Sequence, residues 1–472
     1  MSTDELWRLD ATDQAAAIRE RRVTARDVVQ SHLDRIRAVN PITNAVVREL
    51  EDEALQAADA ADAALAAGEP VGPLHGVPVT VKTNLGVRGQ VTDESNAAFS
   101  DNLAEEDSPP VGLLRRAGAI FHGRTNMPDL GMRWNTDNPL YGPTRNPWDP
   151  NRTPGGSSGG DAAAVATGMT PIGLGNDFGG SIRLPAAYNG VVGLRPTPGR
   201  IPYAPESPED RGMGVMFFYT DGPIARSVRD VRLAFDVLRQ EDARDPFWED
   251  APTGPVGPCD VVMLRDTAGA ELDPEVLQGL EVAADALRDA GYTVREGEMP
   301  SLQRAAELWR DIVATELSSL LTSDFLELFS EDAQRWVKAS IGTSNVLDTR
   351  GYVLATAERA WIAAEWSQRM SSTPLILGPV DTGVAWDVSY DRTGDVDAAV
   401  VALRDRYTLN LAGSLLGLAT ATLPAGVGAS GMPNAVQIAG WRFQEGRALA
   451  AAAAVESRVG VFTPRDPVAE AS

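Results

Sequence analysis

The segment Pro154-Gly155-Gly156-Ser157-Ser158-Gly159-Gly160, followed by an alanine-rich run and then by Gly175-Asn176-Asp177-Phe178-Gly179-Gly180-Ser181, decides how this chain is interpreted. Each glycine cluster carries a serine, and the run between them is typical of a helix followed by a short strand. Glycine adopts backbone dihedrals that other residues avoid, and it lets N–H groups face a ligand. Two such clusters favour a nucleophile or an anion-binding loop over a pair of flexible turns.

Strands and helices alternate on both sides of these clusters. Residues 77–82 form a β-branched run that predicts a strand, and residues 171–175 predict a short buried one. Residues 161–168 predict a helix that begins just after the first serine cluster. A further helix is predicted to begin at Ser181, so the N–H groups of residues 178–181 are expected to converge as in an oxyanion hole. The alternation predicts a layered α/β fold.

The composition limits the class of protein. The net charge of −24 over 472 residues argues against nucleic acid or an anionic membrane as the partner. The N-terminal residues lack the basic and apolar regions of a signal peptide, and no apolar run reaches transmembrane length. The single cysteine, Cys259, excludes an intramolecular disulfide and fits a reducing compartment. We therefore expect a cytoplasmic protein.

Lysine is scarce in this chain. Of its 42 lysine and arginine residues, only Lys82 and Lys338 are lysines. A buried lysine can lose its proton, whereas an arginine cannot, so Lys82 at the end of a predicted strand is a candidate base. The alternative is a lysine that extends from the strand end into solvent.

Several well-known catalytic and binding motifs are incomplete in this chain. Gly155-Gly156-Ser157-Ser158-Gly159 matches a nucleophile elbow, but that triad needs a later histidine, and all three histidines precede residue 123. The glycine loop has no Gly-Lys-Ser/Thr ending as a P-loop would, and there is no His-Glu-x-x-His zinc motif. A serine hydrolase with a lysine as its base remains.

Taken together, the motifs resemble the amidase signature family over nearly the whole chain. Besides Lys82 and the two serine clusters, four segments carry the resemblance: Gly123-Arg124-Thr125-Asn126-Met127-Pro128, Asn146-Pro147-Trp148, Gly222-Pro223-Ile224-Ala225-Arg226-Ser227 and Met432-Pro433-Asn434-Ala435-Val436-Gln437. Any one of these motifs is weak, but their combination is highly specific. The chain departs from the family pattern at Thr83, Asp161 and Phe178, and the last of these leaves the size of the substrate open.

The resemblance assigns roles to residues of both clusters. It implies that Ser181 is the nucleophile, that Ser157, preceded by a cis peptide bond, is the bridging serine, and that Lys82 is the base. The implied oxyanion hole consists of the N–H groups of Phe178, Gly179, Gly180 and Ser181. The implied substrate contacts are Gly131, Met132 and Ser158, and the implied structural supports are Gly155, Gly156, Asp177 and Arg183. No metal and no cofactor are implied.

The resemblance also implies the architecture and the reaction. We expect a single large α/β/α domain around a mixed, mostly parallel sheet, with residues 66–472 as the catalytic domain. Residues 1–65 would form helices that pack on its edge or at a homodimer interface, and the helical region 302–372 would set specificity. The expected activity is hydrolysis of a small aryl or alkyl carboxamide to an acid and an amine or ammonia, with carbamates and esters as related substrates. The alternatives are the glutaminase subunit of a tRNA-dependent amidotransferase and an inactive binding scaffold.

Overall fold

A computed structural model describes residues 3–204, 212–267 and 269–469 of the chain. Both predicted units, residues 1–65 and residues 66–472, therefore include a few positions that lie outside the described residues. Within the described part, no helix is both long enough and apolar enough to cross a membrane.

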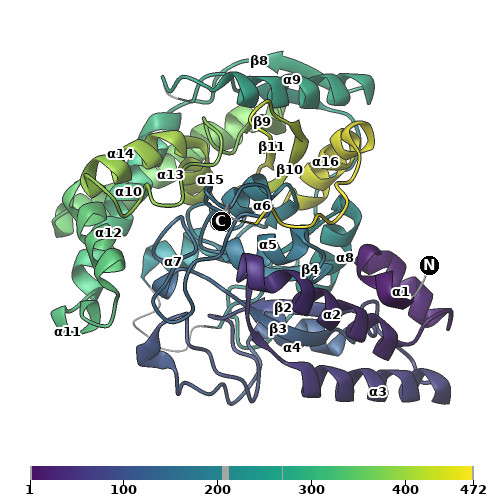
Figure 1. The fold of residues 1–472 in the computed structure, drawn as a ribbon. Coiled ribbons are helices and arrows are strands. Elements are labelled where there is room, and N and C mark those ends of the chain that lie inside the picture. Colours follow the sequence, from purple (N-terminus) through teal and green to yellow (C-terminus); the bar gives the residue numbers. More distant parts are fainter. Residues whose placement is uncertain (1–2, 205–211, 268, 470–472) are drawn as a thin grey trace.

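Eleven strands in the described part of the chain form one sheet, in the order β1-β3-β2-β4-β6-β5-β10-β11-β9-β7-β8 (Figure 1). The strands are β1 (Val46–Glu49), β2 (Pro78–Lys82), β3 (Ile120–Thr125), β4 (Ile172–Asp177), β5 (Val192–Arg195), β6 (Thr220–Ala225), β7 (Asp260–Met263), β8 (Thr293–Glu296), β9 (Leu375–Pro379), β10 (Ala419–Val427) and β11 (Pro433–Gly440).

The sheet is mixed, as predicted, but the prediction that it is mostly parallel is wrong. The parallel pairings are β2–β3, β2–β4, β7–β8 and β7–β9. The other pairings, which include the whole centre of the sheet from β4 to β9, are antiparallel. A strand buried on both faces is a continuous apolar run whichever way its neighbour points, so the sequence pattern did not contain the direction of pairing.

Helices surround the sheet. The α-helices are α1 (Ala11–Arg19), α2 (Ala25–Thr43), α3 (Glu51–Ala67), α4 (Pro109–Arg116), α5 (Gly159–Ala166), α6 (Arg183–Asn189), α7 (Met213–Phe218), α8 (Val228–Leu238), α9 (Pro274–Asp289), α10 (Leu302–Leu320), α11 (Ser323–Leu326), α12 (Glu331–Gly342), α13 (Thr349–Ser372), α14 (Val396–Arg406), α15 (Thr408–Leu416) and α16 (Glu445–Val459). Short 3-10 helices span Thr3–Arg8, Ala97–Phe99 and Asp129–Gly131.

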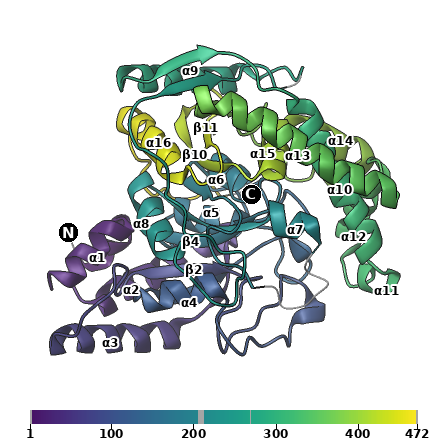
Figure 2. The same ribbon diagram turned by 180° about the vertical axis from the view of Figure 1, so that it is seen from behind.

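The helices form a layer on each face of the sheet. Residues of α4, α8, α9 and α16 share one hydrophobic cluster with the strands, and residues of α6, α10, α13 and α15 share another (Figures 1 and 2). Strand β7 shows the alternation that produces two layers, because Val261 and Met263 join the first cluster whereas Val262 joins the second. The predicted α/β/α layering is confirmed.

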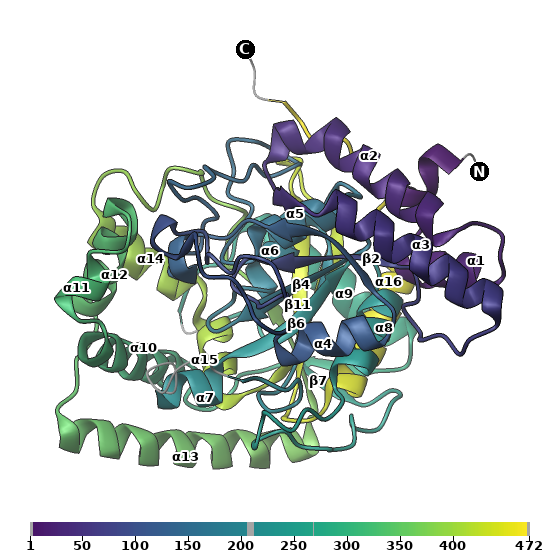
Figure 3. The same cartoon turned by 90° about the horizontal axis from the view of Figure 1, so that it is seen from below.

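Two groups of helices lie at the periphery (Figure 3). The N-terminal helices α2 and α3 pack on each other and on β3, next to the edge strand β1. At the other end of the molecule, α10 to α14 form a helical region outside the sheet, in which α10 contacts α12, α13 and α15. The predicted unit boundary at residue 65 falls within the last turn of α3, and the division into units itself stays a prediction.

Candidate active site

Lys82 ends β2, and its side chain is fully buried. Because β2 and β4 are parallel neighbours, their carboxyl ends lie at the same edge of the sheet. The Lys82 Nζ lies 2.7 Å from Ser157 Oγ, 3.0 Å from Ser158 Oγ and 2.7 Å from Asn176 Oδ1. Asn176, in β4, also donates through Nδ2 to Asn84 Oδ1 at 2.9 Å. The lysine therefore does not extend into solvent.

Burial controls the charge at this edge of the sheet. It lowers the pKa of Lys82 to about 8, although nearby carboxylates, Asp161 foremost, favour the charged amine. Burial also raises the pKa of Asp161, and it raises the pKa of Asp221 to about 7. Asp161 accepts from Thr125 Oγ1 at 2.6 Å and Asp221 accepts from the Tyr219 hydroxyl at 2.8 Å. A neutral amine is thus accessible at Lys82 not far above neutral pH.

The segment before Ser157 passes through a tightly packed space. The Gly156–Ser157 peptide bond is cis. A Cβ atom on Gly156 would lie 2.6 Å from the carbonyl oxygen of Arg133, and one on Gly155 would lie 2.8 Å from the backbone nitrogen of Pro185. Only glycine fits at these two positions, and the close packing holds Ser157 beside the lysine amine.

Asp177 organises the loop of residues 178–181. Its Oδ1 accepts from the Gly180 N–H at 2.8 Å and from Arg183 Nη2 at 2.8 Å, and Arg195 Nε lies 3.4 Å away. Burial alone would raise the pKa of Asp177, but the charges of the two arginines hold it below its usual range. All three charged side chains are fully buried, so the loop is anchored on a dry ion cluster.

One of the four N–H groups predicted to form the oxyanion hole already has a partner within the chain. The Gly180 N–H donates to the Asp177 carboxylate, which as a buried anion needs such donors, so this N–H is not free for a substrate. The N–H groups of Phe178, Gly179 and Ser181 have no hydrogen-bond acceptor among the described residues. Three of the four predicted donors are therefore available.

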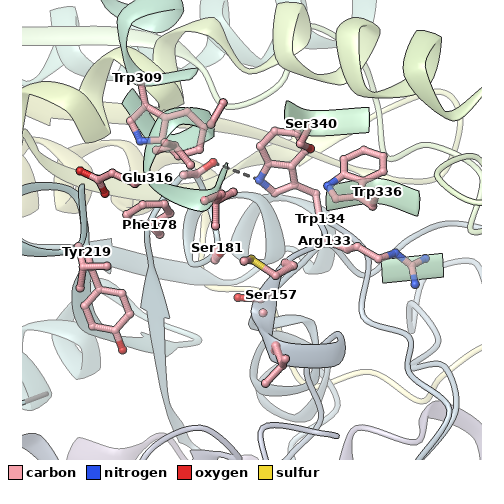
Figure 4. A pocket seen from close by; sticks show the side chains of 18 of the residues that line it. Arg133, Trp134, Ser157, Phe178, Ser181, Tyr219, Trp309, Glu316, Trp336 and Ser340 are labelled. Carbon is pink, nitrogen blue, oxygen red and sulfur yellow. Dashed lines mark hydrogen bonds between the residues drawn. The ribbon is translucent and has the colours of Figure 1, made fainter. Parts of the chain in front are cut away.

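Ser157 and Ser181 line the same cavity, which has a volume of about 290 Å³ (Figure 4). Within the described residues, no hydrogen bond joins their two hydroxyls; such contacts are often loose before substrate binds. Gly131 and Met132 line this cavity, as expected of substrate contacts. Ser158 does not, because its buried hydroxyl contacts the lysine amine instead.

The rest of the cavity wall is mostly apolar, with both aromatic and aliphatic side chains (Figure 4). The aromatic side chains are Trp134, Phe178, Tyr219, Trp309 and Trp336, and the aliphatic ones include Val215, Val313, Leu317 and Leu320. Polar groups contribute at Glu316, Arg310, Ser340 and Arg404. Such a space accommodates a small apolar group while a polar group of the same ligand reaches the serines.

Sequence reasoning missed part of this site. Asn176 directly precedes Asp177 at the carboxyl end of a strand. If that strand had been predicted to pair in parallel with the strand of Lys82, Asn176 would have been expected beside the lysine. Trp309 and Trp336 had no comparable signal, because helical periodicity shows which face of a helix is buried and not which cavity it borders.

A buried lysine bonded to one of two cavity-lining serines, beside N–H groups that have no partner in the described part of the chain, is an arrangement typical of serine hydrolases that use lysine in place of histidine. Comparison with known sequences gives the family. The model of the amidase family matches residues 27–449, so this chain belongs to the amidase family. Ser-Ser-Lys triads are characteristic of that family.

Curated relatives cover nearly the full chain. It is 40% identical to an indoleacetamide hydrolase of Bradyrhizobium diazoefficiens over 98% of this chain and 88% of the relative. It is 34% identical to a glutamyl-tRNA(Gln) amidotransferase subunit of Alkalilimnicola ehrlichii, over 92% of this chain and 94% of that protein.

Solved structures agree with the fold. A 6-aminohexanoate cyclic dimer hydrolase superposes with a TM-score of 0.84 at 27% identity, over 98% of this chain and 99% of the other. A bacterial aryl acylamidase gives 0.83 at 26% identity, over 95% and 96%. The protein is thus an amidase that hydrolyses carbon–nitrogen bonds of amides, and these similarities favour this activity over the inactive scaffold. The glutaminase subunit is the less favoured alternative, since its match is weaker.

Proposed function

We propose that the enzyme hydrolyses the carboxamide of a small aromatic substrate, such as an arylacetamide, to a carboxylic acid and ammonia. The observation that carries this proposal is the cavity of about 290 Å³ that joins aromatic walls to Ser181. The relative at 40% identity is an indoleacetamide hydrolase, which supports a substrate with an aromatic ring next to a primary amide.

The proposed nucleophile is Ser181, activated through a relay. The neutral amine of Lys82 takes the proton of Ser157, whose hydroxyl oxygen takes the proton of Ser181 as the latter attacks the amide carbon. The 2.7 Å contact between Lys82 and Ser157 supports the first transfer. The second transfer requires the Ser181 hydroxyl to turn toward Ser157, and both groups border the same cavity.

The remaining steps use the same groups in reverse. The N–H groups of Phe178, Gly179 and Ser181 stabilise the oxyanion, and the relay returns its proton to the departing ammonia. A water molecule then gives a proton to the relay and attacks the ester on Ser181, which releases the acid and restores the serine.

Specificity is proposed to come from the helical region outside the sheet. Helices α10 and α12 contribute Trp309, Val313, Trp336 and Ser340 to the cavity wall, so the predicted specificity region 302–372 borders the substrate space. The cytoplasmic location and the homodimer remain predictions.

Ammonia release from a panel of amides tests the substrate class. Indole-3-acetamide and phenylacetamide should exceed acetamide by at least about tenfold in kcat/KM, since burying an aromatic ring is worth about 1.5–3 kcal/mol. A preference for glutamine would favour the hypothesis of a glutaminase subunit. A preference for acetamide would refute the hypothesis of an aromatic substrate.

The nucleophile is tested separately. A fluorophosphonate should label the wild type and the variant Ser367→Ala, whose serine is exposed on α13, but not Ser181→Ala. Labelling or full activity of Ser181→Ala would show that another residue is the nucleophile.

A further inference from the structure

Two tryptophans touch the loop of residues 178–181, and only one of them holds it by a hydrogen bond. The Trp134 Nε1–H donates to the carbonyl oxygen of Gly179 at 3.2 Å, as the dashed line in Figure 4 shows. Trp309 packs against the same glycine so closely that a Cβ there would lie 2.7 Å from its ring, yet its Nε1 has no partner among the described residues. The indole of Trp134 therefore has a directional contact with the loop.

The peptide unit between Gly179 and Gly180 is held at both of its polar groups. Trp134 binds its carbonyl oxygen, and Asp177 binds its N–H at 2.8 Å. Because a peptide unit is planar, fixing both groups fixes its rotation about the chain. Gly180 has a φ of +117°, which non-glycine residues rarely adopt, so this loop conformation requires glycine at that position.

The neighbouring N–H groups belong to peptide units that share the Cα atoms of Gly179 and Gly180 with the held unit. The N–H of Gly179 precedes the held peptide unit and the N–H of Ser181 follows it, and both are unpaired within the described part of the chain. If the held unit loses an anchor and shifts, these shared Cα atoms shift with it and displace both donors. The contact from Trp134 thus bears on the geometry of the oxyanion hole and not only on the shape of the cavity.

Trp134 is itself held in place by aromatic packing. Its ring lies edge-to-face on Tyr407, with 5.0 Å between centroids, and on Trp336, with 5.9 Å. The Tyr407 hydroxyl accepts from Trp386 Nε1 at 2.7 Å and contacts the Tyr188 hydroxyl at 3.0 Å. A side chain held this firmly keeps its N–H directed at one acceptor.

We propose that Trp134 is a positioning residue for the oxyanion hole, holding the Gly179 carbonyl so that the N–H groups of Gly179 and Ser181 face the carbonyl oxygen of the bound amide. The inference rests on the proposed role of Ser181 as nucleophile. Oxyanion donors act mainly in the transition state, so losing this contact lowers kcat more than it changes KM.

Trp134→Phe tests the inference, because it keeps a ring in the wall and removes the N–H. One neutral hydrogen bond corresponds to a factor of up to about ten, so kcat should fall about five- to tenfold while KM changes less than about twofold. The matched control is Trp366→Phe, because Trp366 does not line the cavity and its buried indole makes a similar bond, at 2.6 Å, to the Pro300 carbonyl. The control should lose stability and keep kcat.

A second measurement separates positioning from wall packing. An arylmethyl trifluoromethyl ketone mimics the transition state. The Ser181 oxygen adds to its carbonyl carbon, the serine proton passes to the relay, and an oxyanion remains in the hole. Its affinity should fall about five- to tenfold in Trp134→Phe, whereas the affinity of the matching arylethanol, which has no carbonyl, should stay within about twofold.

Three outcomes would overturn the proposal: equal losses for the ketone and the alcohol, a change in KM alone, or an unchanged kcat in Trp134→Phe. Assaying Ser181→Ala alongside shows which idea has failed. If Ser181→Ala is inactive and Trp134→Phe behaves as the wild type, only the positioning role is wrong. If Ser181→Ala remains active, the proposed mechanism is wrong as well.

Discussion

The charge of Lys82 should set the pH dependence of this enzyme. The amine must be neutral to accept a proton from Ser157, and burial lowers its pKa to about 8. The carboxylates that oppose this shift are Asp161, Asp221, Asp177 and Glu94. Because the active form is the deprotonated one, kcat/KM should rise as pH increases through the pKa and level off above it.

The size of the effect follows from the pKa shift. At the ordinary value of 10.5, about 1 lysine in 3,000 is neutral at pH 7, whereas at about 8 the neutral fraction is about 1 in 11. Burial thus increases the amount of competent enzyme about 300-fold at pH 7. Between pH 6 and pH 8 the neutral fraction, and with it kcat/KM, should rise about 50-fold.

The assay is ammonia release from an arylacetamide at low substrate concentration between pH 6 and pH 10. Lys82→Met removes the base from its buried site and should lower kcat/KM at least about 100-fold. The chain supplies its own control, because Lys338, its only other lysine, is exposed on α12, and Lys338→Met should match the wild type. A flat profile from pH 6 to 9, or substantial activity in Lys82→Met, would refute the relay.

Three further outcomes test residues outside the proposed triad. Asn176→Asp keeps an acceptor 2.7 Å from the Lys82 amine but adds a negative charge, so it should raise the pKa of the lysine and move the midpoint of kcat/KM to higher pH; an unmoved midpoint would mean that Asn176 does not influence the base. Asp177→Asn leaves two buried arginines without their counter-charge and should lower the free energy of unfolding by about 3–5 kcal/mol in urea titrations, whereas a loss below about 1 kcal/mol would contradict the ion cluster. Alkylating Cys259, half-buried just before β7, should leave kcat/KM within about twofold, and inactivation would implicate this thiol in the reaction.

The sequence predicted best those residues whose interaction partners lie within the same short motif. Asp177 and Arg183 are six positions apart, and their bond closes within one glycine-rich loop. The glycines at 155 and 156 also indicated a crowded backbone, because glycine is the residue that such a path requires. Lys82 was identified by a different kind of signal, its rarity among so many arginines.

The sequence was less informative where pairing or packing over long distances decides the structure. Strand β6 contains Gly222 and Pro223, which argue against a strand inside a sheet. The structure tolerates Pro223 because β5 pairs with β6 only at Ile224 and Ala225, so the proline has a ladder partner on the β4 side alone. Such an arrangement depends on where a neighbouring strand ends, which no local pattern contains.

In the proposed function, the chemistry comes from the sheet edge and part of the specificity from helices outside the sheet, so that one architecture can serve different amides. Lys82 and Asn176 lie at the ends of paired strands, whereas Trp309 and Trp336 lie on helices outside the sheet. Changes in those helices alter the cavity wall without moving the strand ends that hold the lysine. The related solved structures, with TM-scores of 0.83 and 0.84 at 26% and 27% identity, are named for an aryl acylamide and for a cyclic dimer of 6-aminohexanoate. Differences in the wall helices around the same overall fold would allow such different substrates, so the search for the substrate of this chain begins with the residues that α10 and α12 contribute to the cavity.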